Sequence, residues 1–294
     1  MARIGKVSST RVAGAAVHTY SGGADGFLVN THIVEGPSRL VVFDAQFLRP
    51  YALEAADIID AIGKPVARII ITEVHPDHWA GAGVLHERFP DAPVFALAGV
   101  RNYIRNHGQA LLTRRRAALG DAVPERALVP AHLLDEGAET IDSMRFLFER
   151  AIDAESSGAL VTTLPAARAA FLIDLVYRST LPPVVVPLNR PAGSRPVPLR
   201  QTLTNWIGLV RAWEAKSGEL DLVLLGHGDP LDRDGFREAC RATVAYLSTV
   251  ADVAADAQSA AEFAARMKSE FADREQHGWI DLSASQLFSE GRPV

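Results

Sequence analysis

Four side chains of the types that bind metal ions occur within six residues of this chain. The segment 73–78 is Glu-Val-His-Pro-Asp-His. Glu73 and His75 leave the same side of an extended chain because they are two residues apart. Asp77 and His78 complete the set. Imidazole nitrogens and carboxylate oxygens are ligands of Zn²⁺ and of related divalent ions, so the segment predicts a metal site.

This segment resembles the His-x-His-x-Asp-His signature of the metallo-β-lactamase superfamily. His75, Asp77 and His78 match the signature, whereas Glu73 stands in place of its first histidine. The resemblance implies an α/β fold, namely a four-layer αββα sandwich of two similar halves, here with extra C-terminal helices. It also implies a site for one or two divalent metal ions, which are Zn²⁺ in the family pattern.

The resemblance extends to residues far from this segment. It implies that Asp174, at the end of an apolar strand, bridges the two metals and that His227, in Leu-Gly-His-Gly, is the final ligand. The third histidine of the family pattern is missing. We expect Glu155 to replace it, because the alkylsulfatase-like branch has a glutamate there, and His132 is a rival that comes too early in the chain. Asp44 is expected to orient a ligand from behind the site.

Two glutamates in place of histidines would make the first metal site rich in carboxylate oxygens. Such a site is harder than one built from three imidazoles, which moves the preference from Zn²⁺ toward Mn²⁺ or Fe²⁺. Two alternatives remain open. Glu73 could act as a proton acceptor beside the metal instead of binding it. A single ion could also be held by four of the residues alone: Asp77, His78, Asp174 and His227.

This residue set predicts a metal-dependent hydrolase. A metal-bound hydroxide would attack a small-molecule ester, lactone, thioester, amide or sulfate-ester-like substrate, with Asp77 or Glu73 as the carboxylate that handles the proton. The sequence has no Gly-x-Ser-x-Gly motif and no P-loop, so covalent serine or nucleotide chemistry has no support in it. Two other interpretations are a non-haem iron oxygenase or redox protein on the same fold and a degenerate, non-catalytic metal-binding member.

The predicted elements place these residues at strand ends, and the second half of the chain repeats the element order of the first. In each half a strand ends in an aspartate, and a helix and a further strand lead to ligand-type residues. Ligands bind at the carboxyl ends of strands in open α/β sheets. The predicted strands are 12–20, 26–34, 40–43, 67–72, 93–97, 141–151, 159–164, 171–173 and 222–225, and the predicted helices are 51–62, 80–89, 99–119, 201–216, 236–255 and 260–274.

Composition restricts the class of protein further. The 294 residues are 48% hydrophobic and 22% charged, which is typical of one folded domain over 1–294 with a C-terminal helical extension at about 234–294. The extension could join two copies as a homo-oligomer. A net charge of −5 argues against nucleic acid as the main partner. The sequence contains no run of 18 apolar residues, so it does not suggest a membrane span. Cys240 is the only cysteine, so a reducing cytoplasmic location is expected.

Two segments are candidates for contact with the substrate. Segment 101–116 carries five arginines and no acid, and it is either a solvated helix face or a basic lid that attracts an anionic substrate. Segment 177–200 is rich in proline and arginine, and we expect it to form a substrate wall. Trp79 could add an aromatic face or belong to the core.

Overall fold

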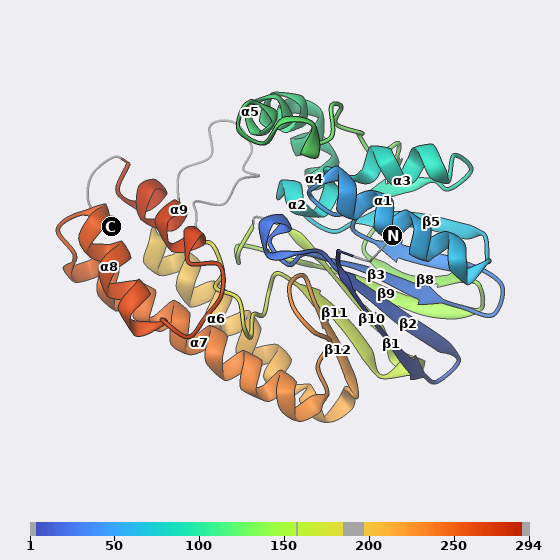
Figure 1. Ribbon diagram of the computed structural model, residues 1–294. Coiled ribbons are helices and arrows are strands. Elements are labelled where there is room, and N and C mark those ends of the chain that lie inside the picture. Colours follow the sequence, from blue (N-terminus) through green and yellow to red (C-terminus); the bar gives the residue numbers. More distant parts are fainter. Residues whose placement is uncertain (1–3, 157, 185–196, 290–294) are drawn as a thin grey trace.

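The computed structural model describes residues 4–156, 158–184 and 197–289. Two β-sheets lie face to face, and helices cover the outer side of each (Figure 1). The first sheet contains β1 (Lys6–Val12), β2 (Ala15–Ser21), β3 (Asn30–Glu35), β4 (Leu40–Phe43), β5 (Val66–Ile71), β6 (Val94–Ala96) and β7 (His132–Leu133). The second contains β8 (Gly137–Ile141), β9 (Met144–Ala151), β10 (Ala159–Leu164), β11 (Ala169–Ile173) and β12 (Leu222–Leu225).

Both sheets change from antiparallel to parallel pairing where the ligand-type residues lie. The first sheet has the order β1 to β7, antiparallel up to β4 and parallel from β4 onward. The second has the order β12-β11-β10-β9-β8, and β11 pairs with β12 in parallel. Asp44 follows β4 and Asp174 follows β11 at equivalent places. The predicted αββα sandwich with two similar halves is therefore confirmed.

The helices form the outer layers. Figure 1 shows α1 to α5 beside the first sheet and α6 and α7 beside the second, with α8 and α9 at their far end. A π-helical turn, Ile104–Gly108, joins α4 to α5. The bounds are α1 (Arg49–Ile62), α2 (Pro76–Trp79), α3 (Ala82–Arg88), α4 (Ala98–Tyr103), α5 (Gln109–Leu119), α6 (Leu199–Ala215), α7 (Arg233–Asp256), α8 (Ala260–Glu270) and α9 (Gly278–Leu287).

Two apolar clusters hold these layers together. Between the sheets, the rings of Phe43 and Phe171 stack with their centroids 4.5 Å apart, so the two halves share one core. The second cluster joins the second sheet to α6 to α9 and includes the fully buried Phe236 and Phe263. Burial of each such side chain contributes about 1.5–3 kcal/mol, so the C-terminal helices are bound firmly to the sandwich.

Some element bounds differ from those predicted. The predicted helix 80–89 corresponds to α3, and the short helix α2 precedes it as a separate element, because the N–H of Gly81 bonds to Gln46 O instead of continuing the helix. A Cβ at Gly81 would also collide with Ala45 O. The predicted strands 12–20 and 26–34 correspond to β2 and β3, which pair as predicted, whereas β1 lies almost wholly outside the predicted ranges. In the described part of the chain, no helix is long and apolar enough to span a membrane.

Candidate metal centre

Seven buried or half-buried side chains from both halves of the sandwich converge at the strand ends. Each offers an imidazole nitrogen or a carboxylate oxygen, and the ligand atoms within each of two groups lie within 4.8 Å of one another. The first group is Glu73, His75, Glu155 and Asp174, and the second is Asp77, His78 and His227. Asp174 also borders the second group, because its Oδ2 lies 3.4 Å from His78 Nε2 and 3.3 Å from His227 Nε2. It is thus placed between the two groups.

Asp44 orients the imidazole of His78. Its carboxylate accepts hydrogen bonds from the backbone N–H of Thr72 at 2.8 Å, from the Thr72 hydroxyl at 2.7 Å and from His78 Nδ1 at 2.8 Å. With the proton held on Nδ1, the lone pair of Nε2 points at the cluster. Asp44 takes this position because β4 ends there in a left-handed conformation, with φ at 61°.

A backbone carbonyl orients His227. Phe27 O lies 2.8 Å from His227 Nδ1, and because a carbonyl can only accept, the imidazole carries its proton on that nitrogen. Nε2 is thereby left free to face Asp77 and Asp174, at 3.4 and 3.3 Å. Residue 226 must be glycine, since a Cβ at Gly226 would collide with the carboxylate of Asp174.

Glu155 joins the first group from the connection between β9 and β10. His75 Nδ1 lies 2.7 Å from Glu73 Oε1 and 3.0 Å from Glu155 Oε1. The N–H of Leu160 donates to Thr72 O at 2.8 Å, which ties the start of β10 to the end of β5 and brings the connection over the cluster. The rival His132 lies exposed on β7 and belongs to neither group.

The donor set fits a metal ion because its buried polar atoms lack other partners. Each buried nitrogen or oxygen without a hydrogen bond carries a free energy cost that a coordinated ion would remove. In the seven residues of the two groups, the following ligand-type atoms are buried and form no hydrogen bond: Glu73 Oε2, His75 Nδ1 and Nε2, His78 Nε2, Glu155 Oε1 and Oε2, Asp174 Oδ1, and His227 Nε2.

The charges of the cluster compensate one another in the metal-free protein. Burial lowers the pKa of His75, but the carboxylates of Glu155 and Glu73 outweigh it and raise that pKa well above its usual value. Burial likewise opposes protonation of His78, and Asp174 and Asp44 reverse the effect and raise its pKa well above the ordinary value. Protons therefore occupy imidazoles that a metal ion would need in their neutral form.

Two aromatic side chains enclose His227: Tyr177, which begins the predicted substrate wall 177–200, and Trp279, which the sequence did not place at the site. The Tyr177 ring stacks on the imidazole at 5.9 Å, and its hydroxyl donates to Asp174 Oδ2 at 2.7 Å. The ring edge of Trp279 meets the imidazole at 4.9 Å and 82°. The spacing of Trp279, Ile280, Ala284 and Leu287 is a helical apolar pattern that could have revealed α9.

A pocket opens above the cluster. Its cavity of about 150 Å³ has His75, Asp77 and Asp174 among its lining residues. Trp79 does not line it, because this side chain is fully buried and its Nε1 donates to Val74 O at 2.8 Å. Of the predicted substrate wall 177–200, residues 185–196 lie outside the described residues.

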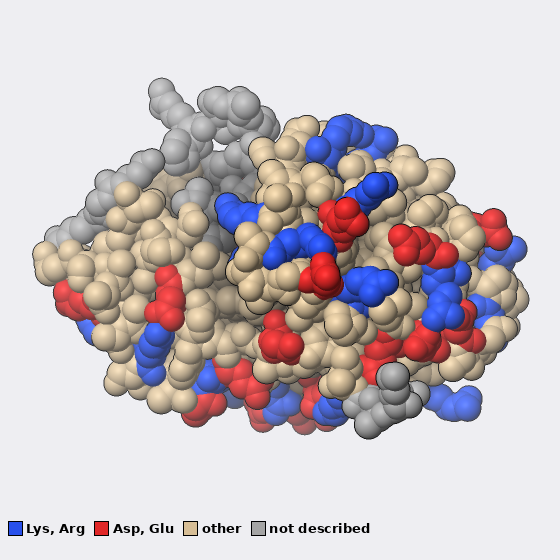
Figure 2. Space-filling view, turned by 45° about the horizontal axis from the view of Figure 1, so that its top comes forward, with Lys and Arg blue, Asp and Glu red and all other residues tan. Residues whose placement is uncertain are grey.

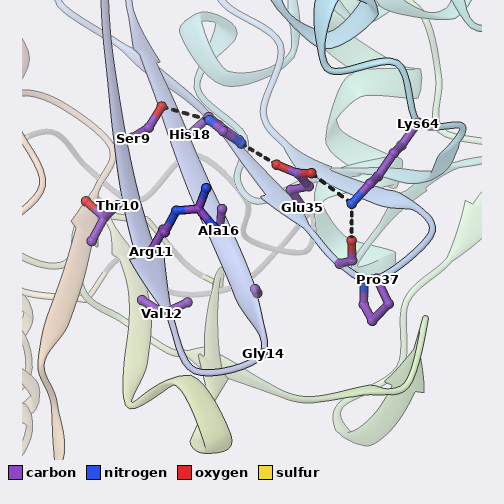
Figure 3. A pocket seen from close by; sticks show the side chains of 12 residues that line it. Ser9, Thr10, Arg11, Val12, Gly14, Ala16, His18, Glu35, Pro37 and Lys64 are labelled. Atoms are coloured by element: carbon purple, nitrogen blue, oxygen red, sulfur yellow. Dashed lines mark hydrogen bonds and ion pairs between the residues drawn. The ribbon is translucent and has the colours of Figure 1, made fainter.

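A larger hollow of about 470 Å³ lies away from these residues, along β1 to β3 (Figure 3). There Ser9 Oγ lies 2.8 Å from His18 Nδ1, His18 Nε2 donates to Glu35 at 2.9 Å, and Lys64 pairs with Glu35 at 2.8 Å. Hydrogen bonds from Lys64 and then His18 lower the pKa of Glu35. Ser9 and His18 are direct cross-strand partners, so the chain of contacts ties three neighbouring strands together.

Comparison with known protein families shows which family the chain belongs to. Residues 24–227 match the family model of the metallo-beta-lactamase superfamily, a region that contains all seven residues of the two groups. The protein therefore belongs to this superfamily, as the sequence resemblance implied. Its members typically bind divalent metal ions, and the histidine and carboxylate groups described above could hold such ions here.

Individual relatives are distant. The uncharacterized protein YobT of Bacillus subtilis (strain 168) is 27% identical over 120 residues, which are 40% of this chain and 50% of that protein. The chain thus matches about half the length of this relative. A metallo-beta-lactamase from Pontibacter korlensis has a TM-score of 0.59 and 15% identity, covering 83% of this chain and 99% of that one.

A second solved structure is the stereoselective inverting sec-alkylsulfatase Pisa1 from Pseudomonas sp. It has a TM-score of 0.65 and 19% identity, and the similarity covers 94% of this chain but 49% of that chain. At these identities the solved structures show the fold alone. The similarity to the sulfatase extends over most of the present chain, including a large part of the C-terminal region after residue 227.

Proposed function

We propose that this protein is a metal-dependent hydrolase that acts on a small-molecule ester, lactone, thioester or sulfate-ester-like substrate. The observation that carries the proposal is the convergence of seven ligand-type side chains, with unpartnered buried atoms, at the base of a pocket. Membership of a superfamily with β-lactamases and an alkylsulfatase among its structural neighbours supports hydrolysis.

The two groups suit different ions. Glu73, Glu155 and Asp174 give the first group three carboxylates beside one imidazole, which favours Mn²⁺ or Fe²⁺ over Zn²⁺. The second group, with two imidazoles and one carboxylate, suits Zn²⁺ or Fe²⁺. A divalent ion bound here would lower the pKa of a water molecule to about 7 and polarise the oxygen of the bond to be cleaved.

Asp77 is the better candidate for the carboxylate that handles the proton. It lines the pocket and is 6% exposed, whereas Glu73 is fully buried and does not line the pocket. The Asp77 carboxylate can accept a proton from the attacking water and return it to the leaving group. Glu73, with Oε1 beside His75 and Oε2 without a hydrogen-bond partner, is placed to bind metal.

A hydrolysis screen with Asp77→Asn tests this proposal. Protein loaded with Mn²⁺ or Zn²⁺ should hydrolyse one or more of 4-nitrophenyl butyrate, hexanolactone and 4-nitrophenyl sulfate, and chelation should abolish turnover. Asp77→Asn should lower kcat by about 10²–10⁴-fold. The control is Asp91→Asn, which alters an exposed carboxylate away from the site and should act as wild type. Turnover that survives chelation, or an Asp77→Asn variant with full kcat and full metal content, contradicts the proposal.

A second candidate function follows from the composition of the second group. Two histidines and one carboxylate are also the ligand set of non-haem iron oxygenases. This function would require Fe²⁺ in the second group and consumption of O₂ with an organic substrate. Anaerobic loading with Fe²⁺ followed by oxygen-electrode measurement separates the two functions, because a hydrolase turns over without consuming O₂.

A further inference from the structure

Two arginines on α5 line the pocket above the cluster. Arg114 and Arg115 are pocket-lining residues, and no ion pair between either of them and another described residue is present. The Nε of Arg115 is buried and has no hydrogen-bond partner among the described residues. Arg116, the next residue, differs: its guanidinium bonds to Asp121 and to Val123 O and is not part of the pocket lining.

Two divalent ions would balance the four carboxylates of the cluster, so Arg114 and Arg115 would add positive charge at the pocket. The Asp44 carboxylate behind His78 would offset part of that charge. Figure 2 shows Lys and Arg interspersed with Asp and Glu over the visible surface, without one large basic area. The two arginines therefore bring positive charge to this pocket, and attraction between charges is stronger where water is partly excluded.

Apolar side chains also line the pocket. Trp279 and Leu282 come from α9, which also contributes Gln286, whereas Leu111 comes from α5 and Phe27 precedes β3. Leu282 is 37% exposed, which places apolar surface within reach of an entering molecule. A pocket lined both by apolar side chains and by two guanidinium groups complements a molecule with an apolar part and an oxyanion, because guanidinium donors match the geometry of such an anion.

We propose that the pocket selects a substrate that carries an oxyanion and a compact apolar group. Arg114 and Arg115 bind the oxyanion, and the α9 wall formed by Trp279 and Leu282 contacts the apolar group. This inference rests on the proposed hydrolase function for the cleavage of the bound molecule. The selectivity of binding depends only on the residues that line the pocket. The cavity of about 150 Å³ is of the size that holds a benzene-sized group, which limits the apolar part to about six carbons.

Binding of a matched pair of small molecules tests the inference without requiring turnover. In calorimetric titration of metal-loaded protein, hexanoate should bind about tenfold or more tightly than hexanamide. The double variant with Arg114→Gln and Arg115→Gln should lose that preference, because each charged hydrogen bond contributes at least several-fold. Arg116→Gln, which removes the same charge from the same helix outside the pocket, should keep it.

The hydrolytic counterpart uses mono-4-nitrophenyl adipate and its neutral methyl ester. Arg114→Gln and Arg115→Gln should each raise KM for the anionic ester about tenfold, with kcat and the neutral ester changed less than about threefold. Leu282→Ser should reduce the advantage of hexanoate over acetate in binding.

The two assays separate the possible failures. If neither ester is hydrolysed while hexanoate binding depends on the arginines, the hydrolase proposal fails and the binding inference stands. The inference is overturned if hexanoate does not bind or binds no better than hexanamide. It is also overturned if hexanoate binds the double variant as tightly as wild type, because the metals alone would then account for binding.

Discussion

At the scale of single residues, the cluster depends on side chains that hold the ligands in place. Asp44 fixes the Nδ1 proton of His78, and Phe27 O does the same for His227. The partners of a metal-binding imidazole commonly change metal affinity by 10- to 100-fold. The effect of such a partner is therefore measurable without altering a ligand.

Replacing the Asp44 carboxylate by an amide should weaken metal binding. Asp44→Asn keeps the size and tolerates the left-handed conformation, but the amide can no longer accept every hydrogen bond offered by Thr72 and His78. We expect metal affinity to fall about 10- to 100-fold, measured by competition with a chromophoric chelator.

Asp142→Asn is the matched control. Asp142 is also an aspartate with positive φ, at 50°, and it accepts bonds from the backbone N–H groups of Ser38 and Arg39, far from the cluster. Metal affinity should be unchanged in this variant. Equal losses in the two variants would mean that Asp44 acts through general stability rather than through His78.

Metal uptake should release protons. The neighbouring carboxylates overcome the effect of burial and raise the pKa of His75 and His78 well above the usual value, so both imidazoles are protonated at pH 7 in the metal-free protein. A metal ion must displace these protons, and its apparent affinity should therefore rise as pH rises and fall as pH falls. Calorimetry in two buffers of different ionisation enthalpy measures the release. Identical heats in both buffers would contradict the expectation.

Four of the seven side chains of the candidate site could be predicted from the residues themselves, because the 73–78 segment places them in a short run after a strand. The family resemblance implied Asp174 and His227, and both follow apolar strands as the segment does. Glu155 could be inferred only from the family pattern, because its loop has no periodic signal. The Phe27 carbonyl could not be foreseen, since any residue type offers that oxygen and only the fold brings it to His227.

At the scale of elements, α9 links the C-terminal region to the site. Trp279 packs its ring edge on His227 and lies 5.7 Å from the ring of Phe27, whose carbonyl holds the same imidazole. α9 therefore supports a metal-ligand candidate from outside the region 24–227 that matches the family model. Removal of the aromatic contact should loosen this ligand.

Comparing Trp279→Phe with Trp279→Leu separates the effect of the aromatic ring edge from that of apolar volume alone. Phenylalanine retains a ring edge facing His227, whereas leucine does not. We expect Trp279→Leu to weaken the binding of the ion in the second group several-fold, and Trp279→Phe to bind it nearly as wild type, measured by chelator competition beside the thermal midpoint of each variant. If both variants bind metal as wild type does, Trp279 has no role in positioning His227.

The fold could be predicted where the sequence pattern is periodic or continuous. Ile69, Ile70 and Ile71 indicate the buried strand β5, and similar apolar runs indicate the strands before Asp174 and His227. The boundaries of β1 to β3 are harder to predict from the sequence. Polar residues on half-buried edge strands are fixed by cross-strand partners rather than by local propensity, as the pair Ser9 and His18 illustrates.

At the scale of the whole molecule, the two halves of the sandwich supply complementary parts of one cluster. The first half contributes Glu73, His75, Asp77 and His78, and the second contributes Glu155, Asp174 and His227. Contact of Phe43 with Phe171 holds the halves together beneath the cluster. Association of two copies through α7 to α9 stays a prediction.

The central claim is that the cluster of seven side chains binds metal. It is tested by the metal content of protein purified without chelators, measured before and after loading with Mn²⁺ or Zn²⁺. Mass spectrometry of the elements should find one or two divalent ions per chain in wild type. His78→Ala and His227→Ala should each lose the ion of the second group, whereas His132→Ala, on the exposed strand β7, should retain the wild-type content. Wild-type protein without stoichiometric metal after loading, or full content in both site variants, would contradict a metal centre at these residues.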